Sequence, residues 1–475
     1  METLQRTANR GSISTGNYEI DNSLKFEADN SEFMARTNSS EGNKQICTLS
    51  MWVKRTELAD AFYFTAGDTA SPWFLLGFYQ DKFYWTTTAG VSASGVMQTN
   101  RVFRDTSAWY HFVLAIDTTQ GTNTNRYKLY VNGVQETSFG TANYPSQNAN
   151  LQIMEDLPQD VGGYTSYFYS GYIAEFVAID GQALAPTEFG EFDADSGIWK
   201  PIDVSGLTFG TNGFYLDFKD GSNLGNDASG GTDFSENNIS AADQSTDTPT
   251  NNFATLNQLQ LDGTVINNSA TITEGATKAT AKEFDIYNTF APTFGVTSGK
   301  WYAEFEYEGS NVDNFVGILD IDAVVPYNSR LGKAGQWSVG LYQSTGTLFV
   351  TSDSGVTTTA NWGATAADGD IMSVAVDMDN YFVYIAKNGT WQNSGNPTSG
   401  ANGTGGKAFD SNKTVGIGCS AYGYNSNGII FTNFGGYTAG TISSAETDDN
   451  GYGTFEYAPP SGYYALCTKN LAEYG

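Results

Sequence analysis

A single histidine, His111, limits the nucleophilic chemistry that this chain could perform. Any Ser–His or Cys–His mechanism would need it as the general base. His111 lies in the segment WYHFVLAID, in which apolar side chains alternate at Tyr110, Phe112, Leu114 and Ile116. Because a strand points successive residues to opposite faces, His111 faces away from this stripe. We interpret it as a structural residue of a regular strand rather than a catalytic base.

Pairs of carboxylates are the second sign of catalysis, because retaining glycoside hydrolysis uses two carboxyl groups about 5 Å apart. The strand motif of jelly-roll glucanases is Glu-x-Asp-x-x-Glu, and the stretch EID at residues 19–21 continues as NSL, without the third acid. Glu304, Glu306 and Glu308 share one face of a predicted strand. We expect them on the exposed side of an edge strand, where like charges oppose aggregation. The sequence therefore predicts that the protein is not an enzyme.

Calcium is the metal that loop carboxylates and amides would suit, since it prefers oxygen ligands. Two groups of such residues stand in predicted turns: Asp377, Asp379 and Asn380, and then Asn226, Asp227 and Asp233. The first group belongs to a hairpin that needs no metal, and the second lacks the EF-hand spacing. No GxGxxG after a strand and no CxxC occurs. We therefore expect no cofactor, and the sequence gives a structural calcium ion no support.

Charge and composition exclude several classes of partner. The formal net charge is −29, from 52 acidic and 23 basic residues, so phosphate backbones and anionic membrane surfaces would repel the chain. No apolar run reaches the 18 or so residues that span a bilayer, and the first 16 residues lack the apolar core of an export signal. We expect neither nucleic-acid binding nor membrane insertion. The three scattered cysteines, Cys47, Cys419 and Cys467, predict buried thiols rather than a disulfide framework.

Aromatic side chains are the remaining candidates for function, since they make up 14% of the chain. On the loops of a β-sandwich they stack on sugar rings or pack against partner proteins. The candidate contact residues, all in glycine-rich settings, are Trp73, Trp85, Tyr164, Tyr167, Trp362 and Tyr424. For each of them a place in the core is the competing interpretation.

The elements that must position these residues are short strands. The segment CTLSMWVKR alternates apolar and polar residues from Cys47, and Asn132-Gly133 is a strong two-residue hairpin signal. The run YIAEFVAI at 172–179 predicts a closing strand with Glu175 as its only charge. We expect an all-β protein with two antiparallel β-sandwiches of the jelly-roll type in tandem. The predicted divisions are an arm at 1–22, a sandwich at 23–200, a strand pair and irregular linker at 201–284, a sandwich at 285–440 and a tail at 441–475.

Two sets of ordered motifs resemble known sandwich families. The Trp-His strand at 109–111, the hairpin LYVNG and the closing strand resemble the laminin-G-like branch of the concanavalin A-like jelly rolls, over about residues 20–200. The motifs GKWY, VGI, the DMDN hairpin ending in KNG, and NFG resemble the SPRY (B30.2-like) sandwich, over about residues 285–440. Both families are binding modules, so the resemblance implies a binding protein.

Connecting segments carry a third resemblance. The pieces FGEFDADSGIWKP, GTNGFYLDF and DTPTNNFATLN, with the C-terminal FEYAPPSGYYALCTKNL, are similar to segments of modular virion proteins of marine tailed bacteriophages. This implies a non-enzymatic structural protein of the virion, attached through residues 1–22 to other virion proteins and assembled as a homotrimer. A tail fibre or adhesin that binds a host-surface polysaccharide is favoured over a capsid decoration or head fibre protein. A secreted polysaccharide-binding protein or hydrolase is the alternative from another class.

Overall fold

The computed structural model describes residues 18–67, 73–87, 95–163, 165–261, 270–282, 285–309, 313–323, 328–352, 355–424 and 426–475. It is nearly all β, with 42% strand and 6% helix, which confirms the predicted fold class. The described residues form two compact units that divide between Thr250 and Asn251. We call them the N-terminal and C-terminal units. Of the predicted arm, residues 1–17 lie outside the described residues.

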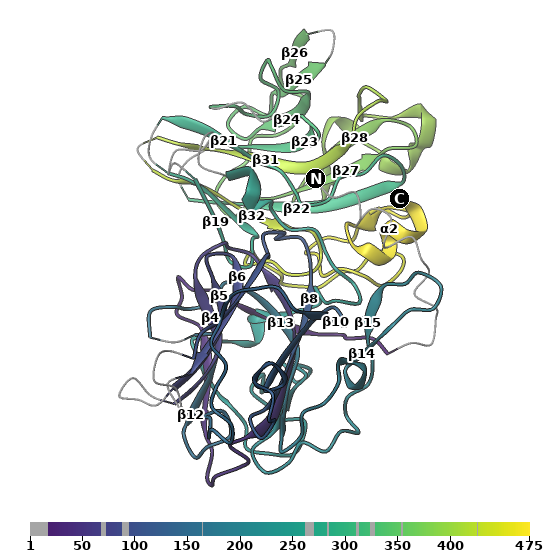
Figure 1. Cartoon of the computed structure of the whole chain (residues 1–475). Coiled ribbons are helices and arrows are strands. Elements are labelled where there is room, and N and C mark those ends of the chain that lie inside the picture. Colours follow the sequence, from purple (N-terminus) through teal and green to yellow (C-terminus); the bar gives the residue numbers. More distant parts are fainter. Residues whose placement is uncertain are drawn as a thin grey trace. The chain divides into compact units, whose positions relative to one another are not determined.

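The N-terminal unit is built from two antiparallel sheets (Figure 1). The first has the order β10 (Val134–Glu136), β9 (Tyr127–Val131), β8 (Tyr110–Asp117), β3 (Ile46–Arg55), β13 (Gly171–Asp180), β1 (Ser23–Phe26) and β18 (Gln244–Ser245), with β16 (Phe214–Leu216) also on β13. The second has the order β11 (Phe139–Ala142), β7 (Met97–Val102), β6 (Lys82–Thr87), β5 (Trp73–Tyr79), β4 (Ala61–Gly67), β12 (Pro158–Val161), β2 (Phe33–Thr37) and β17 (Ser235–Asn237). A separate hairpin joins β14 (Gly190–Phe192) to β15 (Trp199–Pro201).

Alternation along the strands fills the core of this unit. Phe112, Leu114 and Ile116 of β8 point into a cluster of buried side chains drawn from both sheets, as their period of two predicts. Val113, between them, points to the opposite face and packs beneath the segment that follows β13. β13 itself is the predicted closing strand, with its register shifted between Ala174 and Val177.

Residues 201–250 belong to the N-terminal unit and do not form the predicted linker. Most of their larger apolar residues are buried, and Phe214 and Phe234 lie in the core cluster. Buried ion pairs hold the rest of the segment: Lys54–Asp247 at 2.6 Å, Lys25–Asp243 at 2.8 Å and Arg36–Asp227 at 3.2 Å. Ser23 of β1 pairs with Ser245 of β18, so the two ends of the unit lie together.

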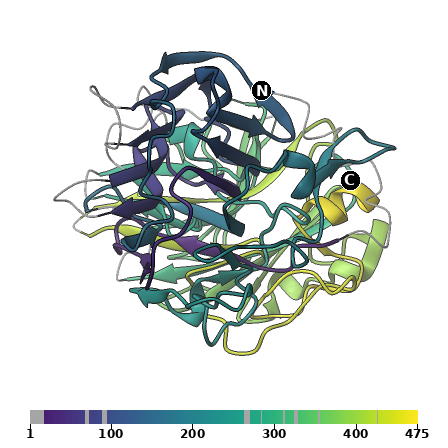
Figure 2. The same ribbon diagram turned by 60° about the horizontal axis from the view of Figure 1, so that its bottom comes forward.

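The C-terminal unit also contains two sheets (Figure 1 and Figure 2). One has the order β19 (Ala270–Thr273), β20 (Lys278–Ala281), β32 (Gly428–Asn433), β22 (Lys300–Glu308), β27 (Ile371–Asp377), β28 (Phe382–Lys387) and β29 (Thr390–Trp391), with β30 (Lys407–Ala408) on β28 and β33 (Tyr464–Ala465) parallel to β22. The other has the order β21 (Ile286–Phe290), β31 (Val415–Gly423), β23 (Phe315–Asp320), β24 (Ser338–Tyr342), β25 (Leu348–Ser352) and β26 (Gly355–Thr359).

Helices are few and short. One α-helix, α2 (Thr468–Tyr474), is described, with 3₁₀ turns η1 (Asn123–Asn125), η2 (Pro186–Glu188), η3 (Ala241–Asp243), η4 (Gln258–Leu261), η5 (Gln392–Ser394) and η6 (Pro397–Asn402). Pro186 begins the turn after β13, where its missing N–H costs nothing. Across the described residues, every helix falls short of the length and apolar content needed to cross a bilayer.

The C-terminal unit is larger than the predicted 285–440 sandwich. The expected tail, 441–475, is part of its packing, because Phe455, Tyr463 and Cys467 are buried against the outer side of the β22 sheet. At the other end, the backbone N–H of Thr468 donates to the carbonyl of Asn252 at 2.9 Å. The entry and exit of this unit therefore also lie side by side.

Candidate functional site: an aromatic face on the N-terminal unit

His111 is a buried structural residue. The Trp199 Nε1–H donates to His111 Nδ1 at 2.9 Å, and Ser50 Oγ lies 2.9 Å from Nε2. Because Nδ1 accepts, the ring proton is on Nε2, which donates to Ser50 and cannot deprotonate it. The ring stacks on Trp52 at 4.5 Å, and burial lowers the pKa of His111 to about 3. This geometry supports the structural interpretation.

Glu304 corrects the prediction of an exposed acidic edge. β22 is an inner strand between β32 and β27, and Glu304 is 2% exposed. Its carboxylate accepts hydrogen bonds from the backbone N–H groups of Glu456 and Tyr457, both at 2.8 Å. Burial raises the pKa of Glu304 to about 6. The carboxylate of Glu304 thus anchors the C-terminal segment, which covers this face of β22. The sequence of β22 alone does not show that another segment covers it.

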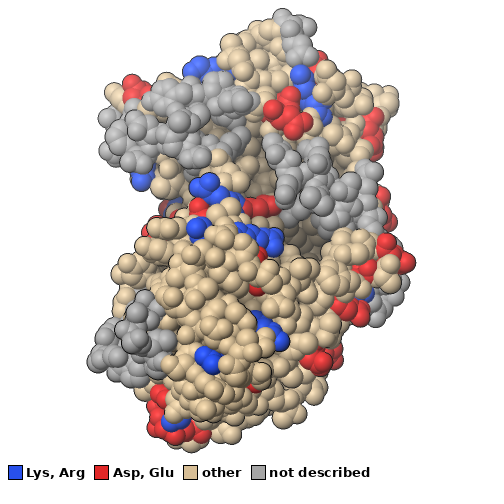
Figure 3. All heavy atoms as spheres, viewed as in Figure 1, with Lys and Arg blue, Asp and Glu red and all other residues tan. Residues whose placement is uncertain are grey.

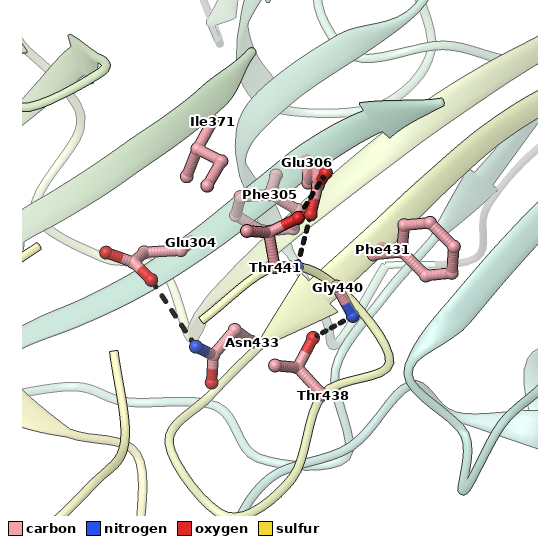
Figure 4. A pocket seen from close by; sticks show the side chains of 9 residues that line it. All are labelled: Glu304, Phe305, Glu306, Ile371, Phe431, Asn433, Thr438, Gly440 and Thr441. Carbon is pink, nitrogen blue, oxygen red and sulfur yellow. Dashed lines mark hydrogen bonds between the residues drawn. The ribbon is translucent and has the colours of Figure 1, made fainter. Parts of the chain in front are cut away.

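The other two acids of β22 also bind within the protein. Figure 4 shows Glu304 directed at Asn433 and Glu306 directed at Thr441, on opposite sides of a small pocket. The Thr441 hydroxyl donates to Glu306 at 3.0 Å, and Glu308 forms an ion pair with Lys278 at 3.5 Å. The three carboxylates therefore have separate partners within the protein.

Two of the carboxylates considered above for calcium, Asp227 and Asp377, are engaged by protein groups. Asp227 pairs with Arg36, while Asp377 accepts from the amide of Asn380 at 2.9 Å and lies 3.4 Å from Lys300. Within the described ranges, no three His, Cys, Asp or Glu side chains are grouped so that they could hold a metal ion. The three cysteines are buried, and none forms a disulfide.

Glu175 is the buried titratable group that the sequence marked only as an isolated charge. It stands at the register shift of β13 with a positive φ of 49° and is 4% exposed. The hydroxyls of Tyr18 and Tyr215 donate to its carboxylate at 2.9 and 2.7 Å. Burial raises the pKa of Glu175 to about 7, although both hydrogen bonds oppose this shift. Its two partners tie Tyr18 and β16 to the closing strand.

The six candidate aromatic residues separate into three groups. Trp85 and Trp362 are core residues, with exposures of 0% and 6%. Their position agrees with a place in the core rather than with a role in ligand contact. Tyr164 lies outside the described residues. Tyr167 and Tyr424 are 47% and 54% exposed, and Trp73 is partly exposed.

Trp73 and Tyr167 lie on the outer face of the second sheet of the N-terminal unit. Along β5, Phe74, Leu76 and Phe78 point into the core, so Trp73, Gly77 and Tyr79 point outward. A β-bulge in β4 turns Phe62 outward and sends both Tyr63 and Phe64 inward. Gly77 is required beside the bulge, because a Cβ there would lie 2.1 Å from the carbonyl oxygen of Ala61.

Four rings form a continuous cluster on this face. Ring centroids are 5.5 Å apart for Tyr167 and Phe62, 6.0 Å for Phe62 and Tyr84, and 5.5 Å for Tyr84 and Tyr79. Gln98 lies opposite Tyr84 in the register and donates its amide to the Tyr79 carbonyl at 3.0 Å. We call these five residues the Tyr79 face. Tyr79 is 40% exposed and Tyr167 is 47% exposed, so the rings at both ends of the cluster are accessible to solvent.

The Tyr79 face presents aromatic rings, tyrosine hydroxyls and one side-chain amide. Exposed aromatic rings that carry hydroxyls, beside an amide, match a ligand with a flat C–H surface and hydroxyls at its edge. The sequence pointed to Tyr167 but missed Phe62, Tyr79 and Tyr84. The alternation of β5 and β6 could have placed Tyr79 and Tyr84 outward, whereas the outward position of Phe62 depends on the bulge in β4.

Comparison with known proteins supports this assignment of the fold. Residues 29–188 match the family model described as the concanavalin A-like lectin/glucanases superfamily. All five residues of the Tyr79 face lie inside this lectin-type match, and the fold is one that mostly serves binding. None of the curated protein sequences matches the chain.

Two solved structures illustrate the similarity that was found. The SPRY domain of human HERC1 is 15% identical, with a TM-score of 0.27, over 35% of this chain and 92% of that domain. Domains LG4-5 of the mouse laminin alpha1 chain are 10% identical, with a TM-score of 0.30, over 93% of this chain and 88% of that structure. Similarity this low carries no functional information.

Proposed function

We propose that the chain is a non-enzymatic virion protein of a tailed bacteriophage, a tail fibre or adhesin whose Tyr79 face binds a glycan on the host surface. The Tyr79 face carries this proposal, because it exposes Tyr79 and Tyr167 on a lectin-type sandwich. A sugar ring stacks on such rings through its C–H face, and its hydroxyls reach tyrosine and Gln98 groups at the edge. The protein acts without a cofactor.

The proposal that this chain is part of a virion rests on the resemblance of its connecting segments to those of phage virion proteins. Residues 1–22 attach the chain to other virion proteins, and three copies assemble, since appendages are built with rotational symmetry. The same domains could serve a capsid decoration or head fibre protein, so position on the particle separates the two. Immunolabelling of virions tests this: label at the tail with blocked adsorption supports the fibre, and uniform label on the head with normal adsorption refutes it.

The attachment role of residues 1–22 has its own test. Deleting them should release the protein from particles while circular dichroism of the truncated chain stays that of a folded β protein. Full occupancy of the truncated chain on particles would contradict the proposal.

Glycan binding is tested by a glycan array followed by titration calorimetry with the sugars that bind. Tyr79→Ala and Tyr167→Ala should each weaken binding about tenfold, the scale of losing one buried aromatic contact of ~1.4 kcal/mol. Phe192→Ala is the matched control, because Phe192 is also exposed, at 51%, but lies on the separate β14–β15 hairpin. Equal loss in all three variants would refute a site at the Tyr79 face. Release of reducing sugar from a bound polysaccharide would show a hydrolase instead.

A further inference from the structure

The sheet with the order β21, β31, β23, β24, β25 and β26 in the C-terminal unit can be followed in Figure 1. Its outer face carries a second group of aromatic side chains, which forms an aromatic surface. Its rings come from neighbouring strands and stand in register: Tyr287 opposite Tyr422, and Phe315 opposite Tyr342. The centroids of these pairs are 4.4 and 4.7 Å apart. Tyr424 stacks on Tyr422 at 6.2 Å and is the ring most exposed to solvent, at 54%.

The guanidinium of Arg330 lies on this surface. Its central carbon is 4.2 Å from the ring centre of Phe349, 4.6 Å from Phe315 and 5.8 Å from Tyr287. One of its N–H groups donates to the carbonyl of Leu331 at 3.2 Å. Among the described residues, no carboxylate lies within 4.0 Å of this guanidinium, whereas other half-buried or buried arginines, such as Arg36 and Arg55, have one. Arg330 is therefore a positioned cation that retains free N–H donors.

The backbone around Arg330 is fixed by side chains of the sheet. Thr289 donates its hydroxyl to the Ser329 carbonyl at 2.8 Å, and Ser420 Oγ accepts from the Leu331 N–H at 3.0 Å. Leu331 lies so close to the sheet that a Cβ at Gly340 would be 2.5 Å from the Leu331 Cβ. Arg330 is thus held before any ligand arrives, which reduces the entropic cost of binding.

Two carboxylates complete the surface. The hydroxyl of Tyr342 donates to Asp313, and the hydroxyl of Tyr422 donates to Asp285. A carboxylate accepts several hydrogen bonds, so Asp285 can also accept one from a hydroxyl of a ligand. The surface therefore combines flat rings, one cation with free donors and two acceptors. We call Asp285, Asp313, Arg330, Tyr422 and Tyr424 the Arg330 face.

We propose that the Arg330 face binds a carboxylated sugar, such as a uronic acid residue of a polysaccharide. The pyranose ring stacks on Tyr424 and Tyr422, the sugar carboxylate pairs with Arg330, and a sugar hydroxyl donates to Asp285. A guanidinium stacked on aromatic rings keeps its N–H edge open to a planar carboxylate, which it binds through two parallel hydrogen bonds. The two acidic acceptors and the net charge of −29 disfavour a ligand with densely spaced phosphates.

The Arg330 face lies in the other unit from the Tyr79 face and shares no residue with it. Only the Arg330 face is proposed to require a charged ligand. An experiment can therefore refute binding at one face without refuting binding at the other. The test uses the full chain, oligosaccharides of galacturonic, glucuronic, mannuronic and guluronic acid, and the same oligosaccharides with their carboxylates reduced to alcohols. Titration calorimetry should detect binding to at least one acidic series, with affinity at least tenfold lower for its reduced form. That ratio is the scale of one hydrogen-bonded charge pair.

Arg330→Gln should reduce the acid-to-alcohol preference at least tenfold, and Arg330→Lys should retain part of it, because lysine keeps the charge but loses the bidentate geometry. Tyr424→Ala should weaken both forms, and its exposed side chain makes it the variant least prone to misfolding. Phe192→Ala, in the other unit and outside both faces, is the control and should change neither, since Phe192 is exposed at 51%. Absence of binding to every acidic series, equal affinity for acid and alcohol forms, or an unchanged preference in Arg330→Gln would each overturn the proposal.

Discussion

Asp247→Asn should strongly destabilise the N-terminal unit. The Asp247 carboxylate accepts from Lys54 at 2.6 Å and from the indole N–H of Trp109 at 3.0 Å. The side chains of Lys54 and Asp247 are 0% and 1% exposed. The substitution keeps the shape of the side chain and an oxygen that can accept from Trp109. It removes the negative charge, so the ammonium of Lys54 remains buried without that counter-charge.

The expected cost follows from this burial. Removing one partner of a buried ion pair costs about 3–5 kcal/mol, a large part of the 5–15 kcal/mol that stabilises a typical domain. With an m-value of about 3 kcal/mol/M, the urea midpoint of the unit should fall by about 1 M or more. Lys54→Met/Asp247→Asn removes both charges, so it should recover at least half of the loss.

Hydrogen exchange measured by mass spectrometry across a urea series follows each unit separately. Peptides from β1, β3 and β13 should lose protection at lower urea in Asp247→Asn, while peptides from β22 and β27 should not change. Glu41→Gln is the control, because the Glu41–Lys44 pair is on the surface, with Glu41 59% exposed, and the midpoint should stay where it is. A shift of the urea midpoint in Asp247→Asn no larger than that of the control would refute the reasoning. So would a double variant that is no more stable than Asp247→Asn.

Three further outcomes are expected. Glu175 has a folded-state pKa of about 7, above its ordinary 4.5, so its contribution to stability is full below pH 4.5 and is lost as pH rises to 7. Glu175→Gln should flatten that part of the stability profile from chemical denaturation, and an identical slope in both proteins would contradict the assignment. The imidazole NMR signals of His111, the one histidine, should not titrate between pH 5 and 8 in the folded protein, since its pKa is about 3; a midpoint near 6.5 would show that the ring is solvated. Deleting residues 441–475 should cost the C-terminal unit its cooperative unfolding transition, whereas a truncated chain with an unchanged melting curve would show that this segment is dispensable.

Local pattern was sufficient to predict the fold class. The period of two in β3 and β8, the Asn132-Gly133 turn and the run of β13 are signals within a few residues of one another. They specify which strand face is buried, because a half-exposed strand must alternate. They do not specify what covers the other face. Glu304 was placed on an exposed edge for this reason, although the distant segment 441–475 buries it.

The extent of each unit and most of the candidate site depended on non-local contacts. Residues 201–250 look like a linker because their apolar residues are sparse, yet buried ion pairs with Lys25, Arg36 and Lys54 attach them to the sandwich. Of the Tyr79 face, only Tyr167 was proposed, although strand alternation also places Tyr79 and Tyr84 outward. Phe62 points outward because of the bulge in β4, and no pattern in the sequence predicts that bulge.

The meeting of the two ends within each unit has a consequence for how such a chain can be rearranged. Ser23 lies beside Ser245 in one unit, and Asn252 is bonded to Thr468 in the other. A block whose first and last residues are neighbours can be inserted into a surface loop of another protein without stretching either partner. Each unit therefore has the geometry of an exchangeable cassette, and recombination could replace one unit while leaving its neighbour folded.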